Sequence, residues 1–292
     1  MISLFLYSLS LLPLWLLYGI SRLCYYFLYY GIRYRRKIVY LNLKKAFYNL
    51  SENERHFIEK KFYKNFCDNF IETLKLLSIS QKDLQSHIIC DYSELEKTLS
   101  ENKNCHIYLG HQFNWELANA HISSTLSSTV VVAYKPIKNK TINYLMLKLR
   151  SRFGSKMVNS KNMKSEIERF SQEQHVLILV ADQNPKIPER SFWTSFLRQK
   201  TAFLNGPELY TTSNKTTVFF ANITKVKRGY YKITISPISD FSKPHILGTI
   251  TNHFAKKLEN VILENPENYL WSHRRWKHEF KEDYKKRWIG NL

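Results

Sequence analysis

Residues 105–118 read CHIYLGHQFNWELA, and this stretch decides the fold that we predict. The run from Cys105 to Leu109 is short and mainly apolar, with β-branched and aromatic members, which is typical of a buried strand. Gly110 ends this run. Asn114 can cap a helix that begins at Trp115, because its side-chain oxygen can accept from amides of the first turn. The stretch therefore predicts a strand, a loop and a helix in succession.

The predicted loop carries His111, and Glu116 follows five residues later. On one continuous helix the two side chains would lie roughly 140° apart around the axis. With His111 in a loop, the Glu116 carboxylate can approach one imidazole nitrogen while the other nitrogen faces substrate. We therefore expect His111 to be a general base oriented by Glu116. The alternative is a histidine that caps a turn and a glutamate that favours a helix N-terminus.

The rest of the chain alternates between strand and helix patterns. Strands are predicted at residues 105–109, 129–134, 175–180, 217–223 and 230–235, and helices at 115–122, 140–152 and 164–172. Residues 41–77 are predicted to be helical with a break near Leu50, after which Ser51 and Glu54 form a capping-box pattern. This alternation predicts an α/β fold, with a mostly parallel central sheet flanked by helices.

Asp182 closes the apolar run at residues 176–182. Ligands of parallel sheets bind beyond the carboxyl ends of the strands, where both His111 and Asp182 are predicted to lie. We interpret Asp182 as a residue that orients a basic side chain or the acceptor. The alternative is a capping role in the loop before Pro185.

The chain is strongly basic. Its 292 residues carry a formal charge of +20, and its pI is near 9.7. This charge favours acidic partners, which include phospholipid head groups, an anionic glycolipid, an acidic carrier protein and nucleic acid.

The amino terminus is predicted to hold the chain at a membrane. Residues 2–21 contain no charged side chain, and a helix of this length spans roughly 30 Å. A cleaved signal peptide is the main alternative, but no basic region precedes the run and no clear small-residue cleavage site follows it. We predict an N-terminal membrane-anchoring helix, with residues 23–32 at the interface. The basic residues Arg33, Arg35 and Arg36 place the rest of the chain in the cytoplasm.

These patterns divide the chain into an anchor, residues 1–32, and one domain, residues 33–292. The four cysteines show no close pairing, which is typical of reduced thiols. His273 and His278 are five residues apart, and no His/Cys cluster has the spacing of metal ligands. We expect no metal and no cofactor.

Several ordered motifs resemble those of the bacterial lipid A biosynthesis acyltransferases, the late acyltransferase family of lauroyl and myristoyl type. The resemblance covers nearly the whole chain. Its motifs are RKIVYLNL at residues 36–43, GHQFNWE at 110–116, YKP at 134–136, LRSRFG at 149–154, ADQ at 181–183 and PENYLWSHRRWK at 266–277.

The resemblance implies an enzyme that moves a fatty acyl chain from a thioester of acyl-carrier protein or coenzyme A to a hydroxyl of a lipid A precursor. It implies a location at the cytoplasmic side of the bacterial inner membrane. His111 would be the general base and Glu116 its partner. Arg150 or Arg152 would stabilise the oxyanion or hold an acceptor phosphate, although either one can also be a solvated helix end. Asn114 and Asp182 complete the predicted substrate-binding or oxyanion residues.

A further group of basic residues is predicted to bind the anionic head group. Lys135 stands where the best-known family members carry arginine, and a lysine cannot bind phosphate in a bidentate way. The residues His273, Arg274, Arg275 and Lys277 would bind a phosphorylated sugar, or alternatively form a basic surface patch against anionic lipid.

Two other functions stay open from the sequence. The same histidine and glutamate would serve an acyltransferase for another membrane lipid, such as an aminolipid, a glycolipid or a lysophospholipid. The second of these other functions is that of a non-catalytic protein that binds anionic lipid or nucleic acid. Because no nucleic-acid motif is present, we expect lipid rather than nucleic acid as the partner.

Overall fold

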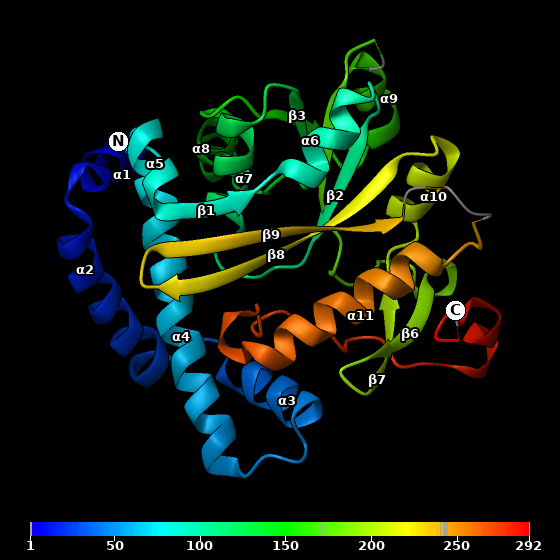
Figure 1. The fold of residues 1–292 in the computed structure, drawn as a ribbon. Coiled ribbons are helices and arrows are strands. Elements are labelled where there is room, and N and C mark those ends of the chain that lie inside the picture. The colour runs from blue at the N-terminus through cyan, green and yellow to red at the C-terminus, as the bar shows by residue number, and fades with distance from the viewer. Residues whose placement is uncertain (1, 171, 240, 242–244, 292) are drawn as a thin grey trace.

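The chain folds around a mixed sheet in a computed structural model that describes residues 2–170, 172–239, 241 and 245–291. The seven-stranded sheet has the order β1-β9-β8-β2-β5-β3-β4, and every pair of neighbours is parallel except β8 and β9 (Figure 1). The strands are β1 Ile88–Asp91, β2 Cys105–Leu109, β3 Thr129–Tyr134, β4 Lys156–Asn159, β5 His175–Val180, β8 Thr217–Lys227 and β9 Tyr230–Ser239. The predicted mostly parallel α/β sheet is therefore confirmed.

The structure adds strands that the sequence patterns did not predict. β1 and β4 are four residues long and form the two edges of the sheet. A separate antiparallel hairpin joins β6 Phe192–Phe196 to β7 Gln199–Phe203. These strands are short, and their alternation of apolar and polar residues extends over too few positions to stand out from a loop.

Helices cover both faces of the sheet. They are α5 Gln81–His87, α6 Ser93–Ser100, α7 Trp115–Thr125, α8 Lys140–Ser151, α9 Met163–Ile167, α10 Gly206–Ser213 and α11 Thr249–Glu264. Successive side chains of a strand point to opposite faces, so Tyr108 packs in one core cluster with Phe254 of α11, whereas Leu109 packs in the other with Ile122 of α7. Every residue of β2 is buried, as expected of a central parallel strand.

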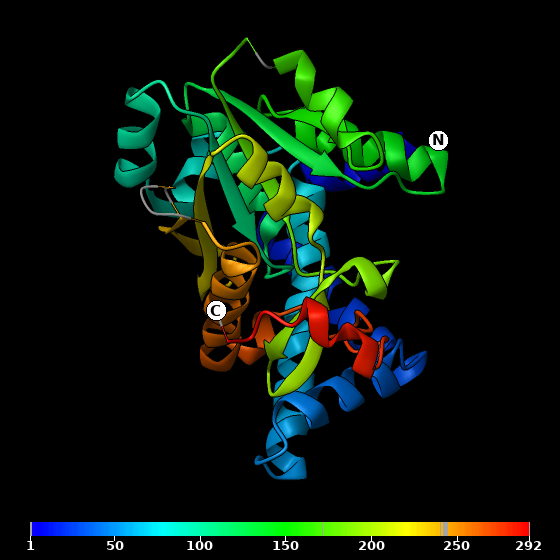
Figure 2. The same ribbon diagram turned by 90° about the vertical axis from the view of Figure 1, so that its right-hand side faces the viewer.

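The predicted helical region with a break is confirmed as two helices, α3 Arg36–Ala46 and α4 Glu52–Lys75. Ser51 caps α4: its hydroxyl accepts from the Glu54 amide, and the Glu54 carboxylate accepts from the Ser51 amide at 2.7 Å. Figure 2 shows the C-terminal segment passing beside the β6–β7 hairpin and α3. Asn42 of α3 ties this segment down by donating to the carbonyl of Trp271 at 2.8 Å.

The structure does not support the predicted membrane-spanning helix. Residues 2–21 do not form one helix: α1 Ile2–Leu11 ends before Pro13, and α2 Leu14–Tyr26 begins after it. Proline has no amide hydrogen and disfavours helical geometry at the preceding residue, which explains the interruption. Within the described part of the chain, no helix is both long enough and apolar enough to cross a bilayer.

The two N-terminal helices lie along the outside of α4 (Figure 1). The hydroxyl of Ser21 in α2 donates to Asp68 of α4 at 2.6 Å, and that of Tyr18 donates to Glu72 at 3.0 Å. A short π-helical turn, Phe27–Gly31, follows α2. The proposed division of the chain after residue 32 remains a prediction.

The fold brings two loops together at the carboxyl ends of two central strands. β2 and β5 are adjacent, Leu109 is paired with Val180, and the Ala181 amide donates to the Leu109 carbonyl at 3.0 Å. Gly110 leaves β2 where α11 packs closely, since a β-carbon at this position would lie 2.5 Å from Leu258. The residues that follow Leu109 and Val180 therefore start side by side.

Candidate active site

His111 and Asp182 meet where these two strands end. Nδ1 of His111 lies 2.5 Å from Oδ1 of Asp182, and the His111 amide donates to Oδ2 at 3.1 Å. The carboxylate thus fixes both the ring and the backbone of His111. Of the two interpretations of Asp182 from sequence, the contact favours the one in which it orients a basic side chain.

The Asp182 carboxylate is almost fully buried. Burial alone would raise its pKa, but the charge and hydrogen bonds of His111, together with the charge of Arg275, hold the pKa of Asp182 well below its usual value. Asp182 is therefore ionised and accepts from the imidazole. Because Nδ1 then carries the hydrogen, Nε2 is the nitrogen with the free electron pair.

The predicted contact between Glu116 and the imidazole is wrong. Glu116 lies in the first turn of α7, as expected, but its carboxylate binds Arg150, whose Nε donates at 2.9 Å and Nη2 at 2.5 Å. The indole of Trp115 donates to the same carboxylate at 3.1 Å. A guanidinium competes better than a neutral imidazole for a buried carboxylate, because it is charged and presents two parallel donors.

The two candidate arginines differ in position and partners. Arg150 is mostly buried beside Glu116, whereas Arg152 donates to the Leu76 carbonyl at 2.6 Å and lies over the ring of Phe153. Burial disfavours a charged guanidinium, but the Glu116 carboxylate raises the pKa of Arg150. Arg150 is therefore the arginine next to the His111 loop.

Asn114 has a structural place rather than the predicted substrate contact. It caps α7 as expected, accepting from the amides of Glu116 and Leu117 at 3.1 and 3.2 Å. Its amide nitrogen donates to Glu72 at 3.2 Å, and the side chain is fully buried. Because its side-chain oxygen and nitrogen both have partners inside the protein, Asn114 positions the loop that carries His111.

The C-terminal motif holds the His111 loop from the other side. The Leu270 amide donates to the His111 carbonyl at 3.1 Å, and the Asn268 side chain donates to the Phe113 carbonyl at 2.8 Å. Gln112 and Tyr269 form an isolated antiparallel bridge. This segment therefore fixes the backbone on both sides of the histidine.

The predicted head-group role of this motif is wrong for Arg275. Its guanidinium is buried, donates to the Ala202 carbonyl at 2.9 Å and to Asn184 at 3.0 Å, and lies over the ring of Phe203. His273 is half-buried and accepts from the Asn184 amide at 3.3 Å, so it also has an internal partner. Arg274 and Lys277 are exposed and stay candidates for an anionic surface.

A cavity of about 740 Å³, here called the active-site cavity, opens beside the histidine. His111, Glu116, Arg150 and Gln183 line its polar part. The cavity continues between α7 and the sheet, where its lining is apolar and comprises Leu109, Ala118, Ile122, Val132, Ile178, Ala221 and Ile223. Polar groups at one end and a hydrocarbon-like lining at the other suit an amphipathic ligand.

Basic side chains surround the outer part of this cavity. The predicted Lys135 is among its lining residues and is exposed. Three further exposed cations, Lys161, Lys186 and Arg190, line it as well. These three had no signal in the sequence, because Lys161 follows β4 whereas Lys186 and Arg190 follow β5, and only the fold brings the two segments together.

Gln183 is the most informative residue without a predicted role. Its side-chain nitrogen lies 2.9 Å from Nε2 of His111, so it donates to the nitrogen that carries the free electron pair. Its position after Asp182 was the available signal, since a residue next to a strand end points into the same site. Among the described residues, no group of three His, Cys, Asp or Glu side chains is arranged to hold a metal ion.

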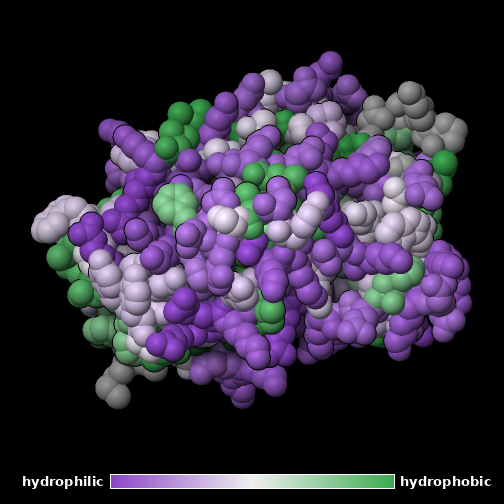
Figure 3. Space-filling model, turned by 90° about the horizontal axis from the view of Figure 1, so that it is seen from below, coloured by the Kyte–Doolittle hydropathy of each residue, from purple (hydrophilic) through white to green (hydrophobic). Residues whose placement is uncertain are grey.

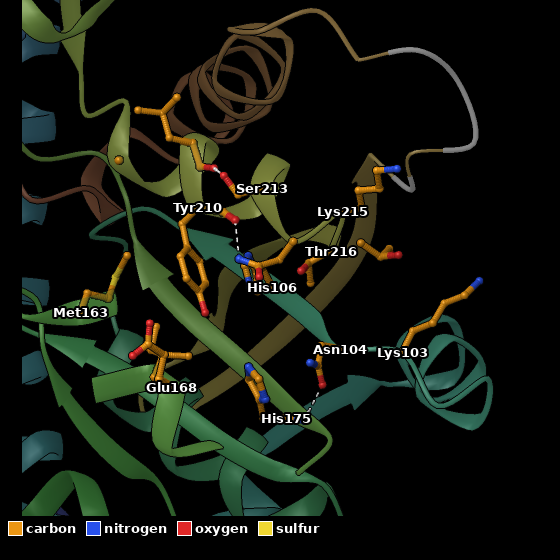
Figure 4. Close-up of a pocket in the computed structure, with 15 residues that line it drawn as sticks. Lys103, Asn104, His106, Met163, Glu168, His175, Tyr210, Ser213, Lys215 and Thr216 are labelled. Carbon is orange, nitrogen blue, oxygen red and sulfur yellow. Dashed lines mark hydrogen bonds between the residues drawn. The ribbon is translucent and has the colours of Figure 1, made fainter. Parts of the chain in front are cut away.

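A second cavity of about 820 Å³ lies at the amino-terminal ends of β2, β5 and β8 (Figure 4). His106 and His175 line it together with Tyr210, Lys215 and Glu168. The His106 ring is stacked on Tyr210, and its Nδ1 lies 2.7 Å from the Thr211 hydroxyl. Burial lowers the pKa of His106 to about 3, with a smaller contribution from His175.

Buried neutral histidines predict an acid-sensitive fold. His106 has a pKa of about 3 and His121 one of about 4, both lowered by burial from an ordinary value of 6.5. Below pH 6.5 the unfolded chain binds protons that the folded chain does not, so the free energy of unfolding falls as the pH decreases. Each histidine contributes a slope of up to about 1.4 kcal/mol per pH unit until its folded pKa is reached.

The measurement is urea unfolding between pH 6.5 and 5, above the range in which exposed carboxylates titrate. Replacing His106 with glutamine should reduce the loss of unfolding free energy over this interval by about 1.5 kcal/mol. His253, an exposed residue of α11, provides the matched control, because its substitution removes an imidazole that is not buried. An unchanged loss in the His106 variant would contradict the neutral state of the buried ring.

The comparisons with known proteins agree with the motifs. Residues 2–278 match the family model described as bacterial lipid A biosynthesis acyltransferase. The chain belongs to this family. Similar relatives are the lipid A biosynthesis palmitoleoyltransferase of Escherichia coli strain K12 and the lipid A biosynthesis acyltransferase of Shigella flexneri, each 23% identical over 189 residues. The match covers 63% of this chain and 59% of each relative, so it spans less than two thirds of their length.

Proposed function

We propose that this family member transfers a fatty acyl chain from an acyl thioester to a hydroxyl of a lipid A precursor, with His111 as the general base. One observation carries the proposal: an imidazole held by a buried carboxylate stands at the polar end of a cavity with an apolar interior. Family membership and the names of the relatives support the choice of reaction.

The reaction follows from the state of the imidazole. Nε2 takes the proton of the acceptor hydroxyl as its oxygen attacks the thioester carbonyl carbon, and a tetrahedral oxyanion forms. When the intermediate collapses, the carbon–sulfur bond breaks and the imidazolium returns the proton to the thiolate. The Asp182 carboxylate stabilises the imidazolium between these two steps.

The contact of Gln183 with His111 supports a proposed position for the acceptor hydroxyl. Its amide donates to Nε2 at 2.9 Å, which is where a hydroxyl must donate before it loses its proton. We therefore propose that the acceptor displaces this amide when it binds. A residue that can rotate away is suited to this position, since it keeps the base hydrogen-bonded until substrate arrives.

Arg150 is proposed to stabilise the oxyanion or an acceptor phosphate. Its Nε and Nη2 bind Glu116, so Nη1 is not committed to that carboxylate. Glu116 thereby positions the guanidinium in the active-site cavity rather than orienting the base. A fixed cation in a partly buried site can favour a developing negative charge without reorganisation during the reaction.

The exposed cations around the active-site cavity are proposed to meet the phosphates of the acceptor. Lys135, Lys161, Lys186 and Arg190 are contributed by loops that follow β3, β4 and β5. Several cations can hold a phosphorylated glycolipid while its hydroxyl reaches His111. Acyl-carrier protein or coenzyme A is the proposed donor, and the bacterial inner membrane, on its cytoplasmic side, is the proposed location.

The chain is proposed to lie on a membrane through α1, α2 and the following turn. Phe5, Trp15 and Leu23 are exposed by 66, 73 and 70% of their surface. Figure 3 shows hydrophobic residues along the left-hand edge, the side on which Figure 1 places α1 and α2. Exposed aromatic and aliphatic side chains on helices are typical of proteins that insert into the interfacial layer of a bilayer.

The apolar part of the active-site cavity is proposed to set the length of the acyl chain. Ala118 of α7 lines it and is buried, so Ala118→Leu would fill space that the end of a chain occupies. We expect kcat/KM for the longest accepted chain to fall roughly ten-fold relative to shorter chains. A series of acyl thioesters of increasing length measures this ratio.

Ala120 provides a matched control. It lies on the same helix and is equally buried, but it is not among the residues that line the cavity. Both substitutions overpack a core and cost about 1–3 kcal/mol of stability. Only Ala118→Leu should change the preference for chain length, and an equal shift in both variants would locate the chain elsewhere.

A competition between acceptors tests the proposed function. The purified full chain is given one labelled acyl thioester with a lipid A precursor and a lysophospholipid in the same vesicles. We expect the label in an ester of the lipid A precursor. Label only in the other lipid would assign the same chemistry to a different acceptor, and no transfer to either would overturn the proposal.

A further inference from the structure

A strongly basic groove lies away from the active-site cavity, between α2, α4 and the turn that joins β8 to β9. It consists of two adjoining hollows of about 530 and 270 Å³, which share Lys64, Asn65 and Lys225. The cations that line this basic groove are Arg22, Lys61, Lys64, Lys225, Lys227 and Arg228. None of the residues that line the groove lines the active-site cavity.

Two carboxylates only partly neutralise the basic groove. The buried Asp68 carboxylate forms ion pairs with Arg228, at 2.6 Å, and with Lys225, at 3.3 Å. Glu267 lies 3.6 Å from Lys61. Among the described residues, no carboxylate lies within 4.0 Å of Arg22 or Lys64. Six cations against two carboxylates leave a strong positive potential in a partly enclosed hollow, where solvent screens it less than on an open surface.

Asp68 holds the segments that line the basic groove in fixed positions. The Ser21 hydroxyl donates to Asp68 at 2.6 Å, which fixes α2 against α4. The same carboxylate holds the β8–β9 turn through Arg228, whose guanidinium also lies 4.1 Å from the ring centre of Tyr18. Three separate segments are thereby locked with their cations facing one hollow.

The basic groove is continuous with the exposed apolar edge of α2. Arg22 is followed directly by Leu23. Tyr26 lies one helical turn after Arg22, on the same side of α2, and lines the groove as well. Leu23 and Phe27 are exposed by 70 and 62%. If these side chains lie in the interfacial layer of a bilayer, the cations beside them are at the depth of the lipid phosphates.

We propose that the basic groove binds the phosphate of an anionic membrane lipid head group. Positive charge matches the phosphodiester, and the apolar edge of α2 matches the acyl region of the same lipid molecule. An acidic protein would match the positive charge but would not account for the exposed leucine and aromatic residues beside it. The proposal goes beyond acyl transfer and rests only on the proposed contact with a membrane.

Vesicle sedimentation with the full-length chain tests the proposal. One set of vesicles contains only phosphatidylcholine, and the other adds phosphatidylglycerol. The double substitution Arg22→Gln with Lys64→Gln removes two exposed cations that hold no ion pair in the described part of the chain, so the fold should persist. Each cation near an anionic surface contributes about five-fold to binding, so the variant should lose roughly 30-fold in affinity for the anionic vesicles.

The control is Lys97→Gln with Lys215→Gln, which removes the same charge from exposed positions on α6 and after α10. It should change the affinity little. Equal losses in both variants would mean that net charge alone drives binding, and would overturn the proposal. A wild-type chain with no preference for phosphatidylglycerol would overturn it as well.

A parallel binding measurement with an acyl-carrier protein separates the two kinds of anionic partner. If the groove variant lost affinity for the carrier protein and kept its affinity for anionic vesicles, the groove would be a protein-docking surface and the proposal would be wrong. Because vesicle binding needs no turnover, the result is independent of whether the chain transfers acyl groups to a lipid A precursor.

Discussion

Replacing His111 with alanine is expected to slow acyl transfer by about 10²- to 10⁴-fold. An alcohol is a poor nucleophile until its proton is removed, and no other imidazole lines the active-site cavity among the described residues. Removing the ring leaves the buried Asp182 carboxylate with only the His111 amide and the charge of Arg275, so some stability is lost as well as the base. Initial rates with a defined thioester and lipid A precursor measure the loss, and thermal unfolding checks the fold.

Gln183→Ala is the matched control for this substitution. It removes a side chain that contacts the same imidazole nitrogen, but it leaves the base in place. We expect its rate to stay within about ten-fold of the wild-type rate, since it loses one neutral hydrogen bond. A His111→Ala variant that was as active as the Gln183→Ala variant would mean that His111 is not the general base.

Asp182→Asn is expected to lower kcat by up to about 10⁴-fold, the size of effect seen when the carboxylate of a hydrolase triad is replaced by an amide. An asparagine amide can donate to Nδ1, which would place the ring hydrogen on Nε2 and remove the free electron pair from the substrate side. KM should change little, because Asp182 does not line the active-site cavity.

Glu116→Ala provides the contrast. It leaves Arg150 largely buried without its carboxylate, and breaking such a pair costs about 3 kcal/mol of stability or more. We expect a large loss of unfolding free energy and a smaller loss of kcat than in Asp182→Asn. The reverse result, a stable Glu116→Ala chain with the lower kcat of the two, would mean that Glu116 rather than Asp182 orients His111.

The central part of the fold could be predicted from local patterns. The β2 run is apolar over five residues, Gly110 ends it, and Asn114 has the side chain that a helix cap requires. Each of these signals is contained within a few residues of sequence. The same holds for Ser51, whose capping box with Glu54 lies within one turn of helix.

The partner of the histidine could not be chosen in the same way. Glu116 is five residues from His111, whereas Asp182 is 71 residues away in sequence and reaches it only because β5 lies next to β2. The local patterns predict that both His111 and Asp182 lie at strand ends but carry no information on strand order. Arg150, which comes from α8, then takes the carboxylate that is nearer in sequence.

The N-terminal prediction depended on composition, which is insensitive to a single residue. Residues 2–21 have the length and hydrophobicity of a span, yet Pro13 separates them into two helices. Hydrogen bonds from Tyr18 and Ser21 to buried carboxylates of α4 then give α2 a protein-facing side. Such tertiary contacts have no local signal, since their partners lie about 50 residues away.

The central claim is that His111 acts as a base on the acceptor hydroxyl and does not itself carry the acyl group. Rapid-quench intact-mass measurement of the protein during the first turnover tests this most directly. The account predicts an unmodified protein mass at every time point while ester appears on the lipid A precursor. An acyl group on His111 that forms before the ester and disappears with it would contradict the account.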